Sequence, residues 1–579
     1  MKTRVWMVVA VTLTFAVLSG CVSGPPPFNP IALRDSSLTA DNGSIVEIQW
    51  LDQQQLPAPP PRNIGFGLPR THRTIAPGYR LVNRPTSMSG QSRWRIQHID
   101  ADGKVLASER LGKKGDSYQG FSDGGDRFYV LMARRNNREK LSSLIVHEIV
   151  KEGLVPEPPR EIAAVPYAGR YLFSSQFFIR IMDDRVYAMV IAPNFQQDTA
   201  DLYAYIFDPE FSPLSEAVHP LDFEAHLVDM EDISLDPDGT FRMVAVVYNG
   251  SRRRYVNRQP NYEYRFLTLS AGMQDLKEVR LFLEDHTIRT LRFAYRPGGE
   301  VACVGLYSNR TTFWQDLMKG VTGAFYMRLD ESSADVAFSN YYPFDEEFLS
   351  RLLTEGQLRR EVDVSHVNIR GINFLDDDSV ILLAEISNRW VAAESFSTVR
   401  TDYDYTAAGY YKVTTTTTYT TYTPIQEDDS IIAMRLSAEG APLWATTIPK
   451  TQYSRNDNTR HDDTVYLSFA HAFVGDRAFV VYNDDPANIA KALGDVTNPF
   501  RRRTNLRFLA SVDLALIGAI VDADGTVTQM VLHDPATQEE QVLMISGDSY
   551  QSGADRLTIA ADSPGSRIQA EIRIAPPDL

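Results

Sequence analysis

An amide or carboxylate side chain recurs at one point of a pattern that is repeated along the chain. Each of these residues lies at the end of an apolar run, and they are Asn136, Asn194, Asn249, Asn309, Asn388, Asn483 and, in the last copy, Asp562. If the copies surround one axis, a ring of amides can hydrogen-bond a sugar or a peptide. The alternative is structural, because Asn and Asp also close turns by hydrogen-bonding the nearby backbone.

Arginine is concentrated in the loops that follow the same apolar runs, although the chain as a whole is acidic. The candidate binding residues there are Arg252, Arg253, Arg254, Arg310, Arg389, Arg501, Arg502 and Arg503. The planar guanidinium group suits carboxylate and phosphate groups. These loops therefore predict an anionic partner, namely an acidic polysaccharide, a lipid head group or an acidic protein patch. The alternative is that they are solvated loops, because Asp402 and Asp484 dilute the positive charge.

Catalytic and metal-binding motifs do not stand out in this sequence. It contains no Gly-x-Ser-x-Gly elbow, His-Glu-x-x-His helix, Walker loop or dinucleotide fingerprint. The ten histidines are scattered, and the Asp-x-Asp-Gly turns at Asp100, Asp236 and Asp522 lack the later ligands of a calcium loop. We therefore expect no catalytic residue, no metal and no cofactor. Because Asp and Glu are abundant, a pair of glycosidase carboxylates stays open as an alternative.

The first residues of the chain have the organisation of an export signal. Lys2 and Arg4 precede an apolar run of 14 residues from Val5 to Leu18, whereas a membrane-spanning helix needs about 20. The run ends in Leu18-Ser19-Gly20-Cys21, which resembles the lipobox of bacterial lipoproteins. The resemblance implies that residues 1–20 are removed, that Cys21 is acylated and that Val22 favours the outer membrane. The alternative is an ordinary signal peptide with Cys21 as a bystander.

Composition and charge exclude several classes of protein. The chain has 579 residues, of which 43% are hydrophobic, and a formal net charge of −16. A general nucleic-acid binder is usually basic, so we expect no nucleic-acid partner. Two cysteines cannot form a disulfide framework, and Cys303 lies in an apolar run that is typical of a buried position. Residues 21–43 are rich in Pro and Ser and predict a flexible tether.

The rest of the chain, residues 44–579, repeats one unit in which an acidic or glycine turn leads into a strongly apolar strand. The seven copies are Gly125–Met132, Asp184–Val190, Asp238–Tyr248, Gly299–Tyr307, Asp378–Ala384, Gly475–Tyr482 and Ala554–Ala560. Further short strands flank each copy. Small antiparallel sheets stacked around an axis cover one another's faces, so this pattern predicts an all-β fold, a β-propeller.

The two ends of the chain predict how the propeller is closed. The last copy is followed by a single strand, Ser566–Ile574, while Arg93–His98 and Lys104–Glu109 form an early hairpin without a preceding unit. We expect these strands to share one blade, which removes exposed sheet edges. The prediction is seven blades, with six or eight left open and a pair of β-sandwiches as the structural alternative. The pattern is similar to uncharacterised bacterial lipoprotein propellers, a resemblance that implies no particular activity.

Long insertions follow the apolar strands and should lie on one face of the disc. Short helices are expected at Phe313–Lys319 and within Phe344–Arg360, and the longest insertion is Ser387–Glu427. Within it, Tyr403–Thr423 is so rich in Thr and Tyr that it predicts a long projecting hairpin. This hairpin is either an arm that binds a partner or a self-contained extension.

The sequence therefore favours a non-enzymatic binding or scaffold lipoprotein on the bacterial outer membrane, facing the periplasm or the cell surface. Its partners would be the membrane, through the N-terminal lipid, and an envelope protein or anionic glycan bound to the loop-rich face. The alternative is a glycan hydrolase or lyase with acidic residues near the central channel. An enzyme would hold two carboxylates whose pKa values are pushed apart.

Overall fold

The computed structural model describes residues 36–575 with internal gaps. The gaps are 40–44, 56–71, 77–78, 86–91, 101–103, 114–115, 168–176, 183–184, 237, 258, 297–298, 310–319, 331–334, 354, 360–363, 365, 407–408, 456–466, 490–503, 506–513, 535–543, 546–549 and 564–565. The predicted signal peptide, Cys21 and the predicted helix 313–319 lie outside the described residues. Within the described part, no helix is long and apolar enough to cross a membrane.

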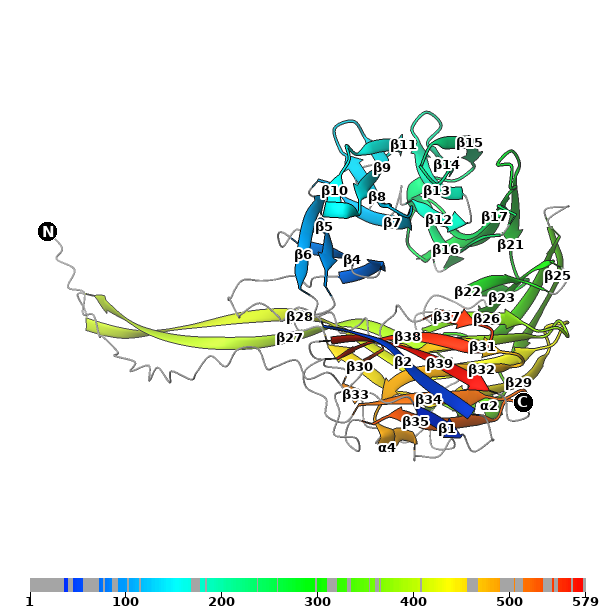
Figure 1. Cartoon of the computed structure of the whole chain (residues 1–579). Coiled ribbons are helices and arrows are strands. Elements are labelled where there is room, and N and C mark those ends of the chain that lie inside the picture. Colours follow the sequence, from blue (N-terminus) through cyan, green and yellow to red (C-terminus); the bar gives the residue numbers. More distant parts are fainter. Residues whose placement is uncertain are drawn as a thin grey trace.

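The described strands form eight sheets of at least four strands (Figure 1). Their strand pairs are antiparallel except for one short parallel pair in sheet 6. We number the sheets by the chain position of the second strand in sheet order, which is Arg556–Ser563 in the last sheet. Sheet 1 contains β3 (His72–Ala76), β4 (Tyr79–Pro85), β5 (Ser92–Ile99) and β6 (Val105–Leu111). Sheet 2 contains β7 (Ser117–Asp123), β8 (Arg127–Asn136), β9 (Leu141–Val150), β10 (Val155–Pro156) and β11 (Arg160–Pro166). Sheet 3 contains β12 (Phe178–Met182), β13 (Arg185–Asn194), β14 (Thr199–Phe207) and β15 (Pro213–Leu221).

In each of the next two sheets, four strands lie side by side in chain order. Sheet 4 contains β16 (Val228–Leu235), β17 (Phe241–Tyr248), β20 (Tyr262–Leu269) and β21 (Leu276–Leu281). A small ribbon of β18 (Tyr255–Val256) and β19 (Gln259–Pro260) lies in its loop. Sheet 5 contains β22 (His286–Tyr295), β23 (Val301–Asn309), β24 (Gly323–Asp330) and β25 (Asp335–Pro343).

The last three sheets include the longest strands and both ends of the described chain. Sheet 6 contains β26 (Val367–Phe374), β27 (Val380–Thr406), β28 (Gly409–Leu436), β29 (Pro442–Ile448), β30 (Gln452–Arg455) and β33 (Thr504–Asn505). Sheet 7 contains β31 (Ala470–Val474), β32 (Arg477–Asp484), β34 (Ala515–Val521) and β35 (Val527–His533). Sheet 8 contains β1 (Ser36–Thr39), β2 (Ile45–Gln55), β36 (Met544–Ile545), β37 (Tyr550–Gly553), β38 (Arg556–Ser563) and β39 (Ser566–Ala575).

The short helices lie between or beside these sheets. They are η1 (Glu152–Leu154), η2 (Ala225–Leu227), α2 (Glu346–Ser350), α3 (Glu355–Leu358) and α4 (Pro486–Ile489). The Asp345 carboxylate accepts a hydrogen bond from the Phe348 backbone N–H and so caps α2, while Phe348 is buried. The prediction of a short helical insertion within Phe344–Arg360 is therefore confirmed.

Apolar clusters join consecutive sheets from sheet 1 to sheet 8. Between sheets 6 and 7, for example, Ile381 and Leu383 of β27 belong to one cluster with Val480 of β32. In sheets 2 to 7 these clusters cover both faces of the second strand, so β17 is buried at all eight positions, whereas the outer strand β25 alternates between exposed and half-buried residues. Each small sheet thus buries both faces only because it has neighbours, and this defines the propeller.

The closure predicted for the two ends of the chain is present, but other strands form it. β2 pairs with β39 from Ile45↔Ala575 to Gln55↔Ser566, which completes the last sheet with an N-terminal strand. The early hairpin at 93–109 instead belongs to sheet 1, where β5 pairs with β4 and β6. The hairpin therefore has its own partner strands, β4 beside β5 and β3 beside β4. β1 also lies inside the segment 21–43 predicted as a tether.

The Asp522-Ala-Asp-Gly525 segment forms the hairpin turn between β34 and β35. In the turn that joins β34 to β35, the Gly525 N–H donates to the Asp522 carbonyl at 2.9 Å. Gly525 has a φ of +86°, and a Cβ atom there would lie 2.9 Å from the Trp444 ring. The Trp444 indole N–H donates to the Ala523 carbonyl at 2.7 Å. This turn therefore joins sheets 6 and 7, and its backbone geometry requires glycine.

Candidate functional site: a projecting arm and its buried polar base

Two strands of sheet 6 extend far beyond the other strands of the fold. β27 has 27 residues and β28 has 28, while no other described strand exceeds 11. They pair without a register shift from Ser387↔Asp428 to Thr406↔Gly409. Figure 1 shows this hairpin, in yellow-green, projecting from the stacked sheets. The predicted hairpin at Tyr403–Thr423 is confirmed, and we call the paired segment 387–428 the arm.

One side of the arm presents a row of small uncharged side chains to solvent. The pairing register places ten described residues on this side: Val391, Ala393, Ser395, Ser397, Val399, Thr401, Thr414, Thr416, Thr418 and Thr420. All ten are exposed. Across the strands the hydroxyl groups of Ser395 and Thr420 lie 2.9 Å apart, as do those of Ser397 and Thr418. We call these ten residues the arm face, and its regular hydroxyl pattern has no charged member.

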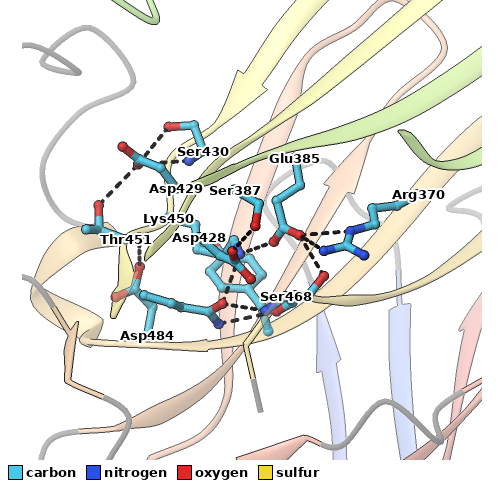
Figure 2. A network of polar contacts seen from close by, with 12 residues as sticks. Arg370, Glu385, Ser387, Asp428, Asp429, Ser430, Lys450, Thr451, Ser468 and Asp484 are labelled. Carbon is cyan, nitrogen blue, oxygen red and sulfur yellow. Dashed lines mark hydrogen bonds and ion pairs between the residues drawn. The ribbon is translucent and has the colours of Figure 1, made fainter. Parts of the chain in front are cut away.

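A buried ionic network lies at the base of the arm (Figure 2). The Glu385 carboxylate of β27 and the Lys450 ammonium form an ion pair, and both side chains are 0% exposed. Arg370 of β26 donates to the second Glu385 oxygen from Nε at 2.9 Å and from Nη2 at 2.6 Å. The Ser468 hydroxyl donates to that same oxygen at 2.8 Å, from the segment leading into β31. The network therefore joins sheets 6 and 7.

A second group of hydrogen bonds lies beside this ion pair, among the first residues of the arm. The Gln426 amide donates to both oxygens of Asp428, at 3.1 and 3.0 Å, and the Ser387 hydroxyl donates to one of them. Lys450 also donates to the Gln452 side-chain oxygen at 2.9 Å. The Gln452 amide in turn donates to the Asn483 carbonyl of β32 at 2.9 Å. We call this whole set of residues the base network.

The two buried carboxylates of the base network have pKa values shifted in opposite directions. Burial alone would raise the pKa of Glu385, but Lys450 and Arg370 outweigh it and hold the pKa below its usual value. Burial, followed by the charge of Glu385, raises the pKa of Asp428. A charged Glu385 is thus compensated by two cations, while Asp428 is held by neutral donors. Such an arrangement fixes the backbone where the arm leaves the sheet.

β-bulges turn the charged side chains of the base network toward each other. The register of β26 and β27 shifts between Ile369 and Gly371, and the register of β27 and β28 shifts between Glu385 and Ser387. A bulge re-aims side chains locally, and here Arg370 is the extra residue. The sequence alone did not indicate this network. The available signal was a charged residue, Glu385, at the end of the apolar run 380–384.

The predicted amides lie in or directly after a strand of six different sheets, and some of them are bound within the protein. Asn136 accepts hydrogen bonds from the backbone N–H groups of Arg138 and Glu139, and Asn194 accepts them from the next turn residues, Gln196 and Gln197. These two residues therefore close turns. Asn483 is buried and accepts from the Ile545 N–H at 2.8 Å, which joins sheets 7 and 8.

The other predicted amides occupy less buried positions. Asn249 and Asn309 are exposed, and Asn388 is half-buried in the arm. Whether these amides bind a ligand stays a prediction.

The predicted arginines are only partly covered by the described residues. Arg252 forms an ion pair with Asp229 of β16, and Arg253 and Arg254 are exposed nearby. The Arg254 guanidinium lies 5.8 Å from the centre of the Tyr262 ring. Arg389 lies in β27 but its side chain is not described, and Arg310, Arg501, Arg502 and Arg503 lie outside the described residues. The anionic partner therefore stays a prediction.

The fold and the arm define a class: a β-propeller with a projecting two-stranded arm. No known protein family matches this sequence, and no curated protein is similar to it. Among solved structures, an apocarotenoid oxygenase from Synechocystis is 8% identical with a TM-score of 0.30, covering 85% of this chain and 84% of its own.

Two further solved structures are similar at the same low level. The β-propeller domain of the trilobed protease from Pyrococcus furiosus is 11% identical with a TM-score of 0.27, covering 69% of this chain and 98% of its own. An α-L-arabinofuranosidase from Fusarium graminearum is 8% identical with a TM-score of 0.27, covering 58% of this chain and 93% of its own. Similarity at this level carries no argument about activity, so function must be inferred from the chain's own residues.

Proposed function

We propose that this protein is a non-enzymatic, lipid-anchored binding protein of the bacterial outer membrane, and that the arm is its binding element. The partner is an envelope protein or an anionic glycan. The observation that carries the proposal is the arm itself, because two strands of 27 and 28 residues extend away from a body whose other strands are short. All ten residues of the arm face are exposed, so this side of the arm is accessible to a partner.

The base network supports the same proposal. It fixes the two strands at Glu385, Ser387, Gln426 and Asp428, at the point where they leave sheet 6. A binding element on a scaffold gains affinity when its direction is preset, because less conformational entropy is lost on binding. The ionic base therefore gives the long hairpin one direction relative to the propeller.

Removing the arm tests this function. We expect a variant in which a short Gly-rich turn joins Val391 to Pro424 to lose at least about 90% of partner recovery from native envelopes, a tenfold loss of about 1.4 kcal/mol. The two joined residues are direct cross-strand partners, so a short turn spans them, and the base network is retained. Recovery is measured by affinity purification from detergent extracts, followed by binding of the purified partner to both forms.

The matched control for the truncation replaces Val391 and Val399 of the arm face by Thr, which keeps the arm and its β-propensity. This variant should retain partner recovery. Equal recovery by the truncated chain and the full chain would contradict the assignment of the arm.

The lipid anchor is tested at Cys21. We expect the wild-type chain to incorporate a labelled fatty acid and to sediment with outer membranes, because several acyl chains hold a protein far more firmly than one. Cys21→Ala should abolish both labelling and membrane association while leaving the fold intact. Because Cys303 is fully buried, it offers no second acylation site in the folded chain. Labelling that persists in the Cys21→Ala chain would contradict the anchor.

A glycan hydrolase or lyase is a second candidate, and one observation favours it. Glu385 and Asp428 are carboxyl groups whose pKa values are shifted apart, as in acid–base pairs. Both side chains are fully buried, however, and their oxygens accept hydrogen bonds within the protein. The test is whether the pure protein degrades an acidic polysaccharide and whether Glu385→Gln abolishes this activity. If both results are obtained, the enzyme proposal replaces the binding proposal.

A further inference from the structure

The arm has two open edges along most of its length. β26 pairs with β27 only as far as Ile386, and β30 pairs with β28 only between Ile425 and Asp428. Beyond these points, among the described strands, β27 and β28 pair only with each other. A hairpin of two strands is marginally stable in water, and stable sheets need three or more strands or a packed face. An additional strand, paired along one of the two open edges, would therefore stabilise the arm.

The two edges differ in charge. Between Glu394 and Asp404, β27 contains Glu394, Arg400, Asp402 and Asp404. The stretch of β28 that pairs with it, Tyr411 to Thr421, contains one charged residue, Lys412. Natural proteins protect exposed edges with charged side chains, so β27, with four charged residues against one, is the better protected edge along this stretch. The strand that completes the arm is therefore expected on the β28 side.

The sequence of β28 is complementary to itself. Thr414 to Thr418 is an unbroken run of five threonines, and Thr420 continues it on the arm face. In an antiparallel pair related by a two-fold axis, threonine would lie opposite threonine in several neighbouring registers. Directly opposed Thr pairs stabilise antiparallel sheets through their methyl and hydroxyl groups.

We propose that the β28 strands of two copies of this chain pair antiparallel and form one sheet in the order β27–β28–β28–β27. A two-fold axis perpendicular to the sheet keeps both arm faces on the same side. The shared face is then four strands wide, with strands about 4.8 Å apart. This inference rests on the proposed function, because it describes the form in which the arm would meet its partner.

Charge reversal between two tagged copies tests the pairing. One variant contains Thr414→Lys, Thr416→Lys and Thr418→Lys, and the other contains Thr414→Glu, Thr416→Glu and Thr418→Glu. Full-length wild-type chains with different tags should be co-captured from purified mixtures in detergent. Two lysine chains, or two glutamate chains, should be co-captured at least about 10-fold less, because like charges then lie opposite each other. A lysine chain mixed with a glutamate chain should recover most of the wild-type signal.

The matched control carries the same charge on the other strand of the arm face, as Ser395→Lys, Ser397→Lys and Val399→Lys. These residues lie opposite Thr420, Thr418 and Thr416 on the side away from the proposed pairing edge. We expect this control to be co-captured to within about 3-fold of wild type, because screening weakens repulsion beyond about 8 Å in physiological salt.

Several results would overturn the proposal: no co-capture of wild-type chains, no recovery in the lysine–glutamate mixture, or loss only in the β27 control. The assay contains no envelope partner, so its failure is distinct from failure of the proposed function. Arm-dependent partner recovery without self-pairing would retain the function and reject the dimer.

Discussion

Replacing Lys450 by methionine should lower the free energy of unfolding by about 3–5 kcal/mol, the usual cost of removing one partner of a buried ion pair. Lys450 and Glu385 are both 0% exposed, and the ammonium group donates to both Glu385 and Gln452. Without it, the carboxylate keeps Arg370, whose side chain is 34% exposed. The measurement is urea denaturation of the full-length chain in detergent at pH 7.

The double variant Glu385→Gln, Lys450→Met is the matched control for this loss. With both charges gone, no buried charge is left without a partner, so the double variant should recover at least about half of the stability that the single variant loses. A double variant that is as unstable as Lys450→Met would show that packing, and not charge, dominates the loss.

The same ion pair predicts the direction of one pH effect. The pKa of Glu385 is lower in the folded chain than its usual value, so the folded state favours the charged carboxylate. Its contribution to stability is therefore complete above the usual pKa of glutamate and is lost as the pH falls through the lowered value. In Lys450→Met this contribution is reduced, since the main compensating cation is absent.

The part of the fold that could be predicted from sequence is the part buried on both faces. The seven repeated runs are the second strands of sheets 2 to 8, and their continuous apolar character follows from having a neighbouring sheet on each side. Sheet 1 was missed because its second strand, Tyr79–Pro85, contains two arginines and a proline. The seven-blade prediction is therefore not confirmed, since the described chain has one more sheet than the repeats indicate.

The base network could not be predicted from sequence for a different reason. Arg370, Glu385, Lys450 and Ser468 come from four separate segments, and only two β-bulges and the contact between sheets 6 and 7 bring them together. The arm was predictable, because a run of Thr and Tyr has strong β-propensity whatever surrounds it. Local propensity thus identified the arm, while its ionic base depends on tertiary structure.

Acid should weaken this protein through His471, which lies beside the base network. His471 belongs to β31, between the rings of Phe469 and Phe473, and a Cβ atom on Gly371 of β26 would lie only 2.4 Å from its Nε2 atom. Burial, followed by the charge of Arg370, lowers the pKa of His471 to about 4. The folded state therefore keeps this imidazole neutral at a pH where an unfolded histidine is already protonated.

The sign of the effect follows from these two pKa values. Between pH 6.5 and 4 the unfolded chain binds a proton at His471 that the folded chain does not, so stability is complete above pH 6.5 and falls as the pH is lowered to about 4. The full contribution is about 3 kcal/mol, at 1.36 kcal/mol for each pKa unit. In His471→Gln this contribution is absent.

The difference in unfolding free energy between wild type and His471→Gln should therefore change by about 3 kcal/mol in favour of the variant between pH 7 and pH 4. This difference is measured by urea denaturation of both chains at each pH. Taking the difference cancels the contribution of the carboxyl groups, because they titrate in both chains. If the unfolding free energies of wild type and His471→Gln change equally with pH, the prediction is contradicted. Because the His471 ring packs against Gly371 of β26, the residue after Arg370, protonation would place a second cation there. Acid would then act on the same junction of sheets 6 and 7 that holds the arm.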